Sequence, residues 1–387
     1  MELLTMTKLT NTPLNMYINF HKTLTILIIL ISICSCKIKK EPDVREYFIS
    51  HRNAERPVSD IIESYELIQL EETEGAFFSN ARRIIFNDGK IIILSGDSRI
   101  LIFSESGEFI RSVNKQGRGP DEYVSLSDIC LDTESGQLIA SGAIKIIRFA
   151  QGGSIISQMN PGFRFNSVHL TEQGQFLFDI RMPGDKKNYN YNLVLTDSEL
   201  NLIDRRLELP LLEGPGLALY GQLNRTSAVP GKDYFFSLGC DTVYRIRKRS
   251  IVPDIVLNYD RKVFSITATG EPEWEGTYNM VSYAETDNCS LLVFRYDKDF
   301  YTVIMEEDDE AEVYRGAIDI SNNFGGSFIW PVYSSYFEER INTLDPERTK
   351  CTNPELLKHY LDNPAEIGSL LIKVDIKNPP GVPLLDF

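Results

Sequence analysis

The chain has 387 residues, of which 42% are hydrophobic, 25% charged and 11% aromatic, with 25 Gly and 18 Pro. These proportions are those of an ordinary globular protein and exclude a mainly disordered, collagen-like or disulfide-dense chain. The net charge is −15 without a basic block, and since nucleic-acid affinity comes mostly from neutralised phosphates, nucleic acid is not an expected partner.

The first feature along the chain is an apolar run from Leu24 to Ile33, preceded by His21 and Lys22. It is too short for a membrane-spanning helix, which needs about 20 apolar residues. Its length and flanks are those of the core of a secretory signal peptide. The pattern predicts a signal peptide over residues 1–35, with Met16 as an alternative start that gives a more usual length.

The apolar run ends in Ile33-Cys34-Ser35-Cys36, which resembles a bacterial lipobox. In that chemistry the thiolate of Cys36 takes a diacylglyceryl group, and cleavage frees its amine for acylation, for example with palmitate. The alternative, a buried helix that happens to contain cysteines, is disfavoured by the abrupt change to Lys37-Ile38-Lys39-Lys40. Several acyl chains anchor a protein firmly, so we expect an envelope lipoprotein of the outer membrane that does not span it.

Residues 36–57 are charged and poor in periodic apolar residues, so they are predicted to form a lipidated tether before the folded domain, residues 58–387. No acidic cluster resembling a surface-export signal follows Cys36. A periplasm-facing position is therefore favoured over the cell surface.

Four cysteines follow the lipobox, at Cys130, Cys240, Cys289 and Cys351, with no C-x-x-C pair. They are interpreted as small buried apolar residues, with one disulfide as the alternative and no pairing assigned. No His stands near another His or a Cys, so neither a zinc site nor another metal or cofactor is predicted.

The body of the chain repeats with a period of 46 residues. Residues 93–103 correspond to residues 139–149, and the turn glycine Gly107 corresponds to Gly153. A further 46 residues leads to another apolar segment at 193–198. Beyond it the register drifts, but paired short apolar segments continue at 234–246 and 291–305.

Each repeat holds four short segments rich in β-branched and aromatic residues, separated by turns such as Asn87-Asp88-Gly89. Four antiparallel strands in 40–50 residues are typical of a propeller blade, whereas a β-sandwich shows no fixed period. With insertions around Gly270 and in residues 335–364, the length predicts six blades. The predicted fold is an all-β, six-bladed β-propeller.

The ring needs its ends joined, because an open sheet edge would remain otherwise. Residues 66–70 form a lone alternating segment that is predicted to complete the last blade beside residues 369–374. One helix is predicted, with Asn353 as N-cap, Pro354 at its first position and residues 355–361 following.

The segment Gln116-Gly117-Arg118-Gly119-Pro120-Asp121-Glu122-Tyr123 resembles the GRGPGEY-type segment of six-bladed β-propeller lipoproteins of Bacteroides-like bacteria. That family has no known function and is related to NHL-repeat propellers. Weaker resemblances occur in residues 65–71, 241–246, 325–331 and 362–364, and this chain has Asp121 where the family often has Gly. The resemblance implies the fold and an envelope location but no activity.

The same segment, residues 114–123, is predicted to join two blades on one face of the ring and to present Arg118, Asp121, Glu122 and Tyr123 together. In a functional interpretation, Arg118 holds a carboxylate, a sulfate or sugar hydroxyls, and Tyr123 stacks on a sugar ring. In the structural interpretation, which is favoured, Arg118 pairs with Glu122 or Asp121 to pin the blades and Tyr123 packs.

Three other parts of the chain also have both a functional and a structural interpretation. The acidic run Glu306–Glu310 lacks the Gly of a shaped calcium loop, so a solvated hairpin tip is favoured over a Ca²⁺ site. Asp128 and Asp132 either face the channel or accept backbone hydrogen bonds. The aromatic stretch 328–333 is interpreted as core rather than a sugar platform.

No nucleophile, Walker loop or metal-binding motif is present, so no catalytic residue is predicted. The predicted function is non-catalytic: binding of a glycan, a peptide or an envelope protein partner on the loop-bearing face. The alternative is a glycan or ester hydrolase or lyase whose residues converge at the central channel, since function is independent of fold.

Overall fold

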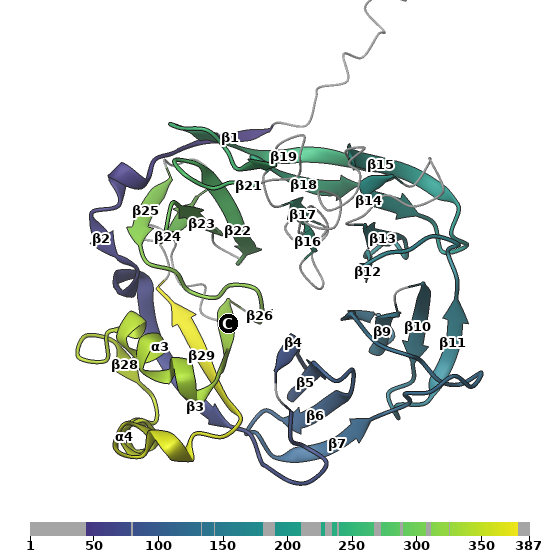
Figure 1. The fold of residues 1–387 in the computed structure, drawn as a ribbon, viewed down its shortest axis with the longest axis horizontal. Helices are drawn as coiled ribbons and strands as arrows, with labels where there is room; N and C mark the ends of the chain where they lie inside the picture. Colours follow the sequence, from purple (N-terminus) through teal and green to yellow (C-terminus); the bar gives the residue numbers. More distant parts are fainter. Residues whose placement is uncertain are drawn as a thin grey trace, which may run out of the picture. The chain divides into compact units, whose positions relative to one another are not determined.

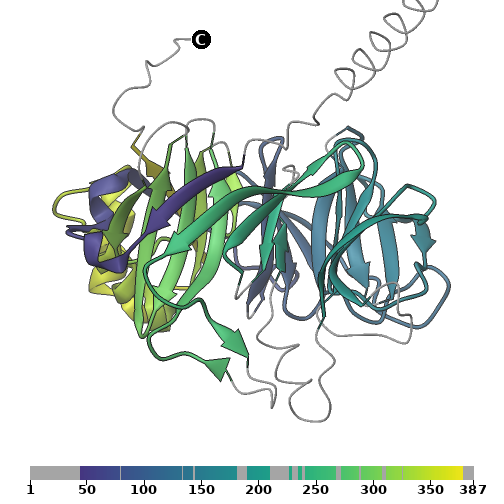
Figure 2. The ribbon, with the colours of Figure 1, turned by 90° about the horizontal axis from the view of Figure 1, so that it is seen from above.

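Six β-sheets stand around a common axis in the computed structural model (Figure 1). The structure describes residues 44–377 except 79, 133, 143, 181–189, 210–225, 229–233, 238–239, 267–271, 287–288, 307–310 and 325. In each sheet one edge strand lies beside this axis and the opposite edge strand lies at the rim (Figure 1), and Figure 2 shows the same sheets from the side. The predicted six-bladed β-propeller is confirmed.

The first three blades each consist of four antiparallel strands in chain order from the axis outward. Their short β-branched and aromatic segments alternate with tight turns, as the repeat predicts. Blade 1 contains β4 (Ala81–Asn87), β5 (Lys90–Ser95), β6 (Ile100–Ser104) and β7 (Phe109–Val113). Blade 2 contains β8 (Asp128–Asp132), β9 (Gln137–Gly142), β10 (Lys145–Phe149) and β11 (Ile155–Met159). Blade 3 contains β12 (Ser167–Leu170), β13 (Phe176–Asp179), β14 (Tyr191–Thr196) and β15 (Leu202–Glu208).

The other three blades each carry a fifth strand at the rim. Blade 4 contains β16 (Thr226–Ala228), β17 (Tyr234–Ser237), β18 (Thr242–Arg247) and β19 (Ser250–Tyr259). Blade 5 contains β22 (Tyr278–Glu285), β23 (Ser290–Tyr296), β24 (Asp299–Met305) and β25 (Glu312–Arg315), preceded by a hairpin of β20 (Ser265–Ile266) and β21 (Pro272–Glu273). Blade 6 contains β26 (Asn323–Phe324), β27 (Ser327–Val332), β29 (Leu370–Ile376) and β3 (Ile62–Gln69), with β28 (Lys350–Cys351) at its rim.

Blade 6 joins the two ends of the domain. The N-terminal strand β3 runs antiparallel to the C-terminal strand β29, with Leu67 opposite Ile372 and Glu66 opposite Lys373. This is the predicted closure of the ring. It removes the open edge that the last blade would otherwise present.

Turn glycines set the approach of neighbouring blades. Gly107 and Gly153, equivalent in the repeat, have φ of +92° and +86°. A Cβ on Gly107 would lie 2.1 Å from the carbonyl oxygen of Gln69, and one on Gly153 would lie 2.6 Å from Val113. Each glycine therefore meets the fourth strand from the axis of the preceding blade, and its missing side chain allows that contact.

Residues 44–57, called the strap below, lie on the rim rather than in a free tether. Within them β1 (Arg45–Ile49) pairs in parallel with β19, η1 (His51–Asn53) follows, and β2 (Arg56–Pro57) pairs in parallel with β25. Figure 1 shows this purple segment along the outside of two blades. Tyr47 and Ile49 alternate into the core and are buried. This two-residue alternation, which the sequence interpretation overlooked, is typical of a strand and lets the segment pair with the outer strands of blades 4 and 5. Residues 36–43 lie outside the described part.

Within the described residues, the two α-helices lie in the connection between β27 and β29 of blade 6. The predicted helix is confirmed as α4 (Pro354–Asp362), but α3 (Phe337–Leu344) was not predicted. Short 3₁₀ turns are η2 (Val58–Ile61), η4 (Ser334–Tyr336) and η5 (Pro364–Glu366). No helix within the described ranges has the length and apolarity needed to cross a membrane.

Candidate functional site

The candidate loop follows β7 and leads to β8, the innermost strand of blade 2. The backbone N–H of Gly117 donates to the carbonyl of Tyr123 at 3.0 Å, and the N–H of Tyr123 donates to the carbonyl of Lys115 at 2.9 Å. These two bonds close residues 115–123 into a compact hairpin-like loop. Since strands alternate in direction, this loop and the turn between β9 and β10 lie on the same face of the ring.

Glu122 fastens the interior of this loop. Its carboxylate accepts the backbone N–H of Gly119 at 2.6 Å. A Cβ on Gly117 would lie 1.9 Å from the same Glu122 oxygen, so glycine is needed there for the carboxylate to fit. Glu122 thus has a structural role in the loop.

Tyr123 is part of the packing between blades. Its side chain is 4% exposed, and its hydroxyl donates to the carbonyl of Ser98 at 2.9 Å. The ring meets Phe149 edge to face with the centroids 6.1 Å apart. Burial raises the pKa of the Tyr123 hydroxyl. The ring therefore has no open face for a sugar, and the structural interpretation fits this residue.

Arg118 and Asp121 are exposed on the same loop. Neither side chain has a hydrogen-bond or ion-pair partner among the described residues. The expected ion pair of Arg118 with Glu122 or Asp121 is therefore not formed. Arg118 is held on a rigid loop with its guanidinium available.

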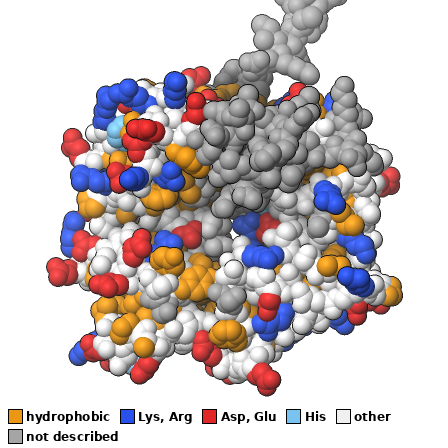
Figure 3. All heavy atoms as spheres, in the orientation of Figure 1, with side chains coloured by type: hydrophobic (Ala, Val, Ile, Leu, Met, Phe, Trp, Pro, Cys, Tyr) orange, Lys and Arg blue, Asp and Glu red, His pale blue; other side chains and the backbone are white. Residues whose placement is uncertain are grey.

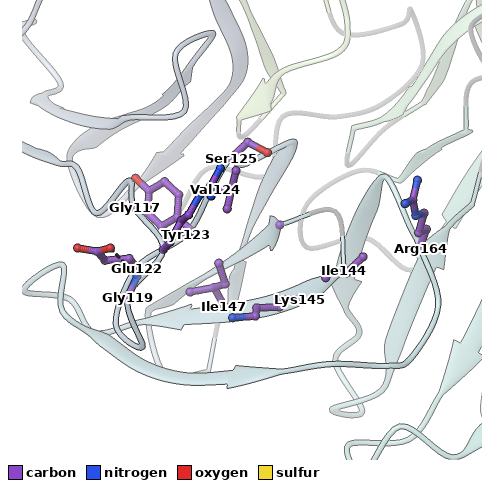
Figure 4. Close-up of a pocket in the computed structure, with 12 residues that line it drawn as sticks. Gly117, Gly119, Glu122, Tyr123, Val124, Ser125, Ile144, Lys145, Ile147 and Arg164 are labelled. Carbon is purple, nitrogen blue, oxygen red and sulfur yellow. Dashed lines mark hydrogen bonds between the residues drawn. The ribbon is translucent and has the colours of Figure 1, made fainter.

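A cavity of about 570 Å³ lies beside this loop. Figure 4 shows the loop on one side, Ile144, Lys145 and Ile147 on a second, and Arg164 across the opening. Arg118 also lines the cavity. Three cations, from two connections and the start of β10, thus border one space.

The charge balance of this cavity, called the Arg118 pocket below, is positive. Among its described lining residues Glu122 alone is acidic, and its carboxylate already accepts a backbone hydrogen bond. Lys145 donates to Gln158 at 2.9 Å, and Gln158 in turn donates to the carbonyl of Pro120 at 2.8 Å. This bridge ties blade 2 to the loop. The pocket is cationic in a protein of net charge −15.

The walls of the Arg118 pocket are partly apolar. Val124 is 74% exposed and Ile144 is 45% exposed at the opening. Apolar walls with a few placed charges are typical of sites that orient a ligand. The arrangement suits a ligand with an anionic group and a hydrocarbon or ring surface.

Sequence reasoning missed Lys145 and Arg164 in this site. Lys145 corresponds to Arg99 in the 46-residue repeat, so the repeat marks a basic residue at this position. Arg164 lies in the connection between β11 and β12, where no pattern marks it. Only the ring brings these cations to the loop.

A second polar cluster occupies the innermost strands of three consecutive blades. Arg83 on β4 binds Asp128 on β8 through two hydrogen bonds of 2.8 Å, and His169 on β12 lies 3.9 Å from the Asp128 carboxylate. Burial by itself would raise the pKa of the Asp128 carboxyl, but the Arg83 guanidinium outweighs it and the pKa is lowered. Burial lowers the pKa of His169 to about 4, so its imidazole is neutral at pH 7.

Asp128 and Asp132 therefore have different surroundings. Asp128 also accepts the backbone N–H of Ile129, whereas Asp132 accepts the N–H groups of the following turn and binds Arg148 at 3.2 Å. Both carboxylates are engaged within the fold. The backbone-bonding interpretation fits Asp132, and an interblade ion pair fits Asp128.

The remaining candidates fall in the core or outside the described residues. In the stretch 328–333, Phe328, Ile329, Trp330 and Val332 are buried, so the core interpretation is correct. Residues 307–310 of the acidic run and Cys36 lie outside the described part.

The described cysteines are free thiols, and burial raises the pKa of Cys130 to about 12. Within the described ranges no three His, Cys, Asp or Glu side chains are grouped to hold a metal.

Solved structures with the same architecture come from Bacteroides. A Bacteroides fragilis protein, provisionally described as exported, is 17% identical over 86% of this chain and 99% of its own, with a TM-score of 0.68. A Bacteroides vulgatus member of the DUF4221 family is 10% identical over 82% of this chain and 97% of its own, with a TM-score of 0.50. At these identities the likeness establishes the fold.

No curated protein matches the sequence. A family model does match, over residues 44–375, a range that begins with the strap and ends in β29. The match therefore takes in all six blades, and the chain belongs to the DUF4934 family, a domain of unknown function.

Proposed function

We propose that this protein is a non-catalytic binding protein of the cell envelope, and that the Arg118 pocket takes the anionic group of its ligand. The observation that carries the proposal is the convergence of Arg118, Lys145 and Arg164 on one cavity of about 570 Å³. Charge-assisted hydrogen bonds to a carboxylate or sulfate are the strong interactions that such cations make.

The ligand class follows from the lining of this pocket. Guanidinium groups bind carboxylates and sulfates in a bidentate manner, while Val124 and Ile144 leave apolar surface for the rest of the ligand. Glycans with uronic acid or sulfate groups, acidic peptides and an acidic patch of an envelope protein share this chemistry. The stacking role once expected of Tyr123 is not part of the proposal.

The pocket is tested by titrating the full-length protein in detergent with oligogalacturonate, a sulfated disaccharide and an acidic peptide, using calorimetry. At least one should bind, and Arg118→Ala or Arg164→Ala should weaken binding by tenfold or more, since a hydrogen bond to a charged group is worth about 1.5–3 kcal/mol. Lys115→Ala is the matched control, because Lys115 lies on the same loop but does not line the pocket.

Two results would contradict the proposal. One is that none of the anionic probes binds. The other is that an anionic probe binds equally well to Arg118→Ala, Arg164→Ala and the wild type.

We also propose that Cys36 carries the lipid anchor and that the propeller is held in the bacterial envelope at the outer membrane, facing the periplasm or the surface. The lipobox-like segment supports this, as does the provisional description of the Bacteroides fragilis neighbour as exported. We further propose that the blades of this propeller are related to NHL repeats.

Lipidation is tested by labelling cells with a palmitate analogue and fractionating them. Cys36→Ser should abolish labelling and move the protein out of the membrane fraction, because no thiol would remain to accept the diacylglyceryl group. Cys34→Ser is the control and should be labelled normally. Labelling of Cys36→Ser would refute the assignment.

A further inference from the structure

A second cavity, of about 800 Å³, lies on the same face of the ring at the junction of blades 5 and 6. Its walls come from the turn between β23 and β24, the connection from β25 to β26, and helix α3, which is inserted between β27 and β29. The Arg118 pocket, by contrast, lies between the loop from β7 to β8, the turn between β9 and β10, and the connection from β11 to β12. This second cavity is called the α3 pocket below.

Two aromatic side chains in the α3 pocket are left open to solvent. Phe300 is 43% exposed and Tyr336 is 57% exposed, and both line the cavity. No hydrogen-bond partner for the Tyr336 hydroxyl occurs among the described residues. Large exposed aromatic groups inside a concavity are typical of surfaces that meet a partner molecule.

The charges of the α3 pocket are balanced, unlike those of the Arg118 pocket. Its described lining residues include three cations and three carboxylates: Lys298, Arg315, Arg340, Asp299, Asp319 and Glu339. An anionic or a cationic ligand would be attracted by three of these charged groups and repelled by the other three. A purely apolar ligand would strip water from all six without replacing it.

Half of these charged groups are already engaged by the protein. Arg340 lies over the ring of Trp330 at 5.4 Å, Arg315 donates to the carbonyl of Glu55 at 3.3 Å, and Asp319 accepts the N–H of Ser321 at 3.1 Å. The side chains of Lys298, Asp299 and Glu339 have no hydrogen-bond or ion-pair partner within the described part of the chain. An ammonium donor and two carboxylate acceptors are therefore available beside the two rings.

We propose that the α3 pocket is a second binding site that takes a neutral carbohydrate. The C–H face of a sugar ring packs on Phe300 and Tyr336, while its hydroxyls accept from Lys298 and donate to Asp299 or Glu339. A neutral polyhydroxylated ligand uses both signs of charge without repulsion. The volume lies within the ~300–1,000 Å³ typical of small-ligand sites. This site does not depend on an anionic ligand in the Arg118 pocket.

The test uses the full-length protein in detergent and neutral oligosaccharides: maltoheptaose, cellopentaose, mannopentaose and xylohexaose, titrated by calorimetry. At least one should bind, and Phe300→Ala or Tyr336→Ala should weaken its affinity by tenfold or more. Both side chains are exposed, so the variants should fold, which their thermal unfolding would verify. Phe77→Ala is the matched control, since Phe77 is also exposed, at 62%, but does not line the pocket.

The outcomes separate this site from the Arg118 pocket. Arg118→Ala should leave binding of the neutral sugar unchanged, and Phe300→Ala should leave binding of an anionic probe unchanged. The inference is overturned if none of the four oligosaccharides binds. It is equally overturned if binding survives in both aromatic variants, or if Arg118→Ala abolishes it.

Discussion

Neighbouring residues of the loop between β7 and β8 have opposite roles. Glu122 and Tyr123 are turned into the loop and the core, where they bond to Gly119 and Ser98, whereas Arg118 and Asp121 are exposed. The eight-residue segment 116–123 thus contains both the residues that hold the loop together, Glu122 and Tyr123, and the exposed residue Arg118. The position of Arg118 depends on the stiffness that the other residues provide.

The role of the Glu122 carboxylate in holding this loop is tested by Gly117→Ala. The new Cβ would lie 1.9 Å from the Glu122 carboxylate and would displace it from the N–H of Gly119. We expect a loss of about 1–3 kcal/mol in the free energy of unfolding, measured by denaturant titration. Gly152→Ala is the control, because no atom lies within 4 Å of its added Cβ. Equal stability of the two variants would contradict the assigned role of Glu122.

The buried imidazole of His169 predicts a pH dependence. Its pKa is about 4 in the folded protein, below the ordinary ~6.5, so the unfolded chain binds more protons between these values. The stability contribution is fully present above pH 6.5 and is lost as the pH falls toward 4. Both ring nitrogens are buried without hydrogen-bond partners among the described residues, and Asp128 and Arg83 are the charged groups beside them.

We therefore expect the free energy of unfolding to fall by up to about 3 kcal/mol from pH 7 to pH 4 through this group. His169→Gln should flatten this part of the profile, as measured by urea unfolding at a series of pH values. An unchanged slope in the variant would show that His169 does not titrate as described.

At the scale of elements, the strap covers the rims of blades 4 and 5, and side-chain contacts fasten it. Arg45 binds Asp254 at 2.9 Å, and Asp254 is also bound by Arg245 and Arg247. The hydroxyl of Tyr278 accepts the N–H of His51 at 3.0 Å and donates to Asp260 at 2.5 Å. The strap is thus held by side chains as well as by its two parallel ladders.

Tyr278→Phe should loosen the strap without unfolding the blades, because it removes only the shared hydroxyl. We expect amide hydrogen exchange in residues 44–57 to become faster by tenfold or more, while exchange in blades 1–3 stays unchanged. Tyr336→Phe serves as control, since the hydroxyl of Tyr336 has no partner among the described residues. Unchanged exchange in the strap would show that Tyr278 does not fasten it.

At the scale of the whole molecule, the ring is closed by the ladder between β3 and β29, whose strands come from opposite ends of the domain. The sheets pack face to face through buried apolar clusters that join neighbouring blades. Acidic and basic side chains are interspersed on the face seen in Figure 3, and hydrophobic side chains collect over the sector of blade 6. Closure is thus a property of the ring that a single blade does not have.

Glu66→Pro places a residue without an N–H in the closing ladder, opposite Lys373, without removing a buried apolar side chain. We expect the thermal midpoint of the whole domain to fall, because Pro in a central strand disrupts the ladder. Ile110→Pro is the control, since Ile110 is the bulged residue of the rim strand β7. If both variants melt at the same temperature, ring closure does not govern global stability.

The amino-acid sequence by itself determined the local architecture of this protein. The 46-residue repeat, the turn glycines Gly107 and Gly153 and the closing segment 66–70 predicted the six blades and their closure, because strand alternation and turn chemistry depend on near neighbours. The tertiary structure alone decided the rest. The strap adds to edges more than 200 residues away, Lys145 and Arg164 meet Arg118 only when blades stand side by side, and α3 becomes a pocket wall only against blade 5. Such contacts join residues that no local pattern relates, so only the closed ring brings them together.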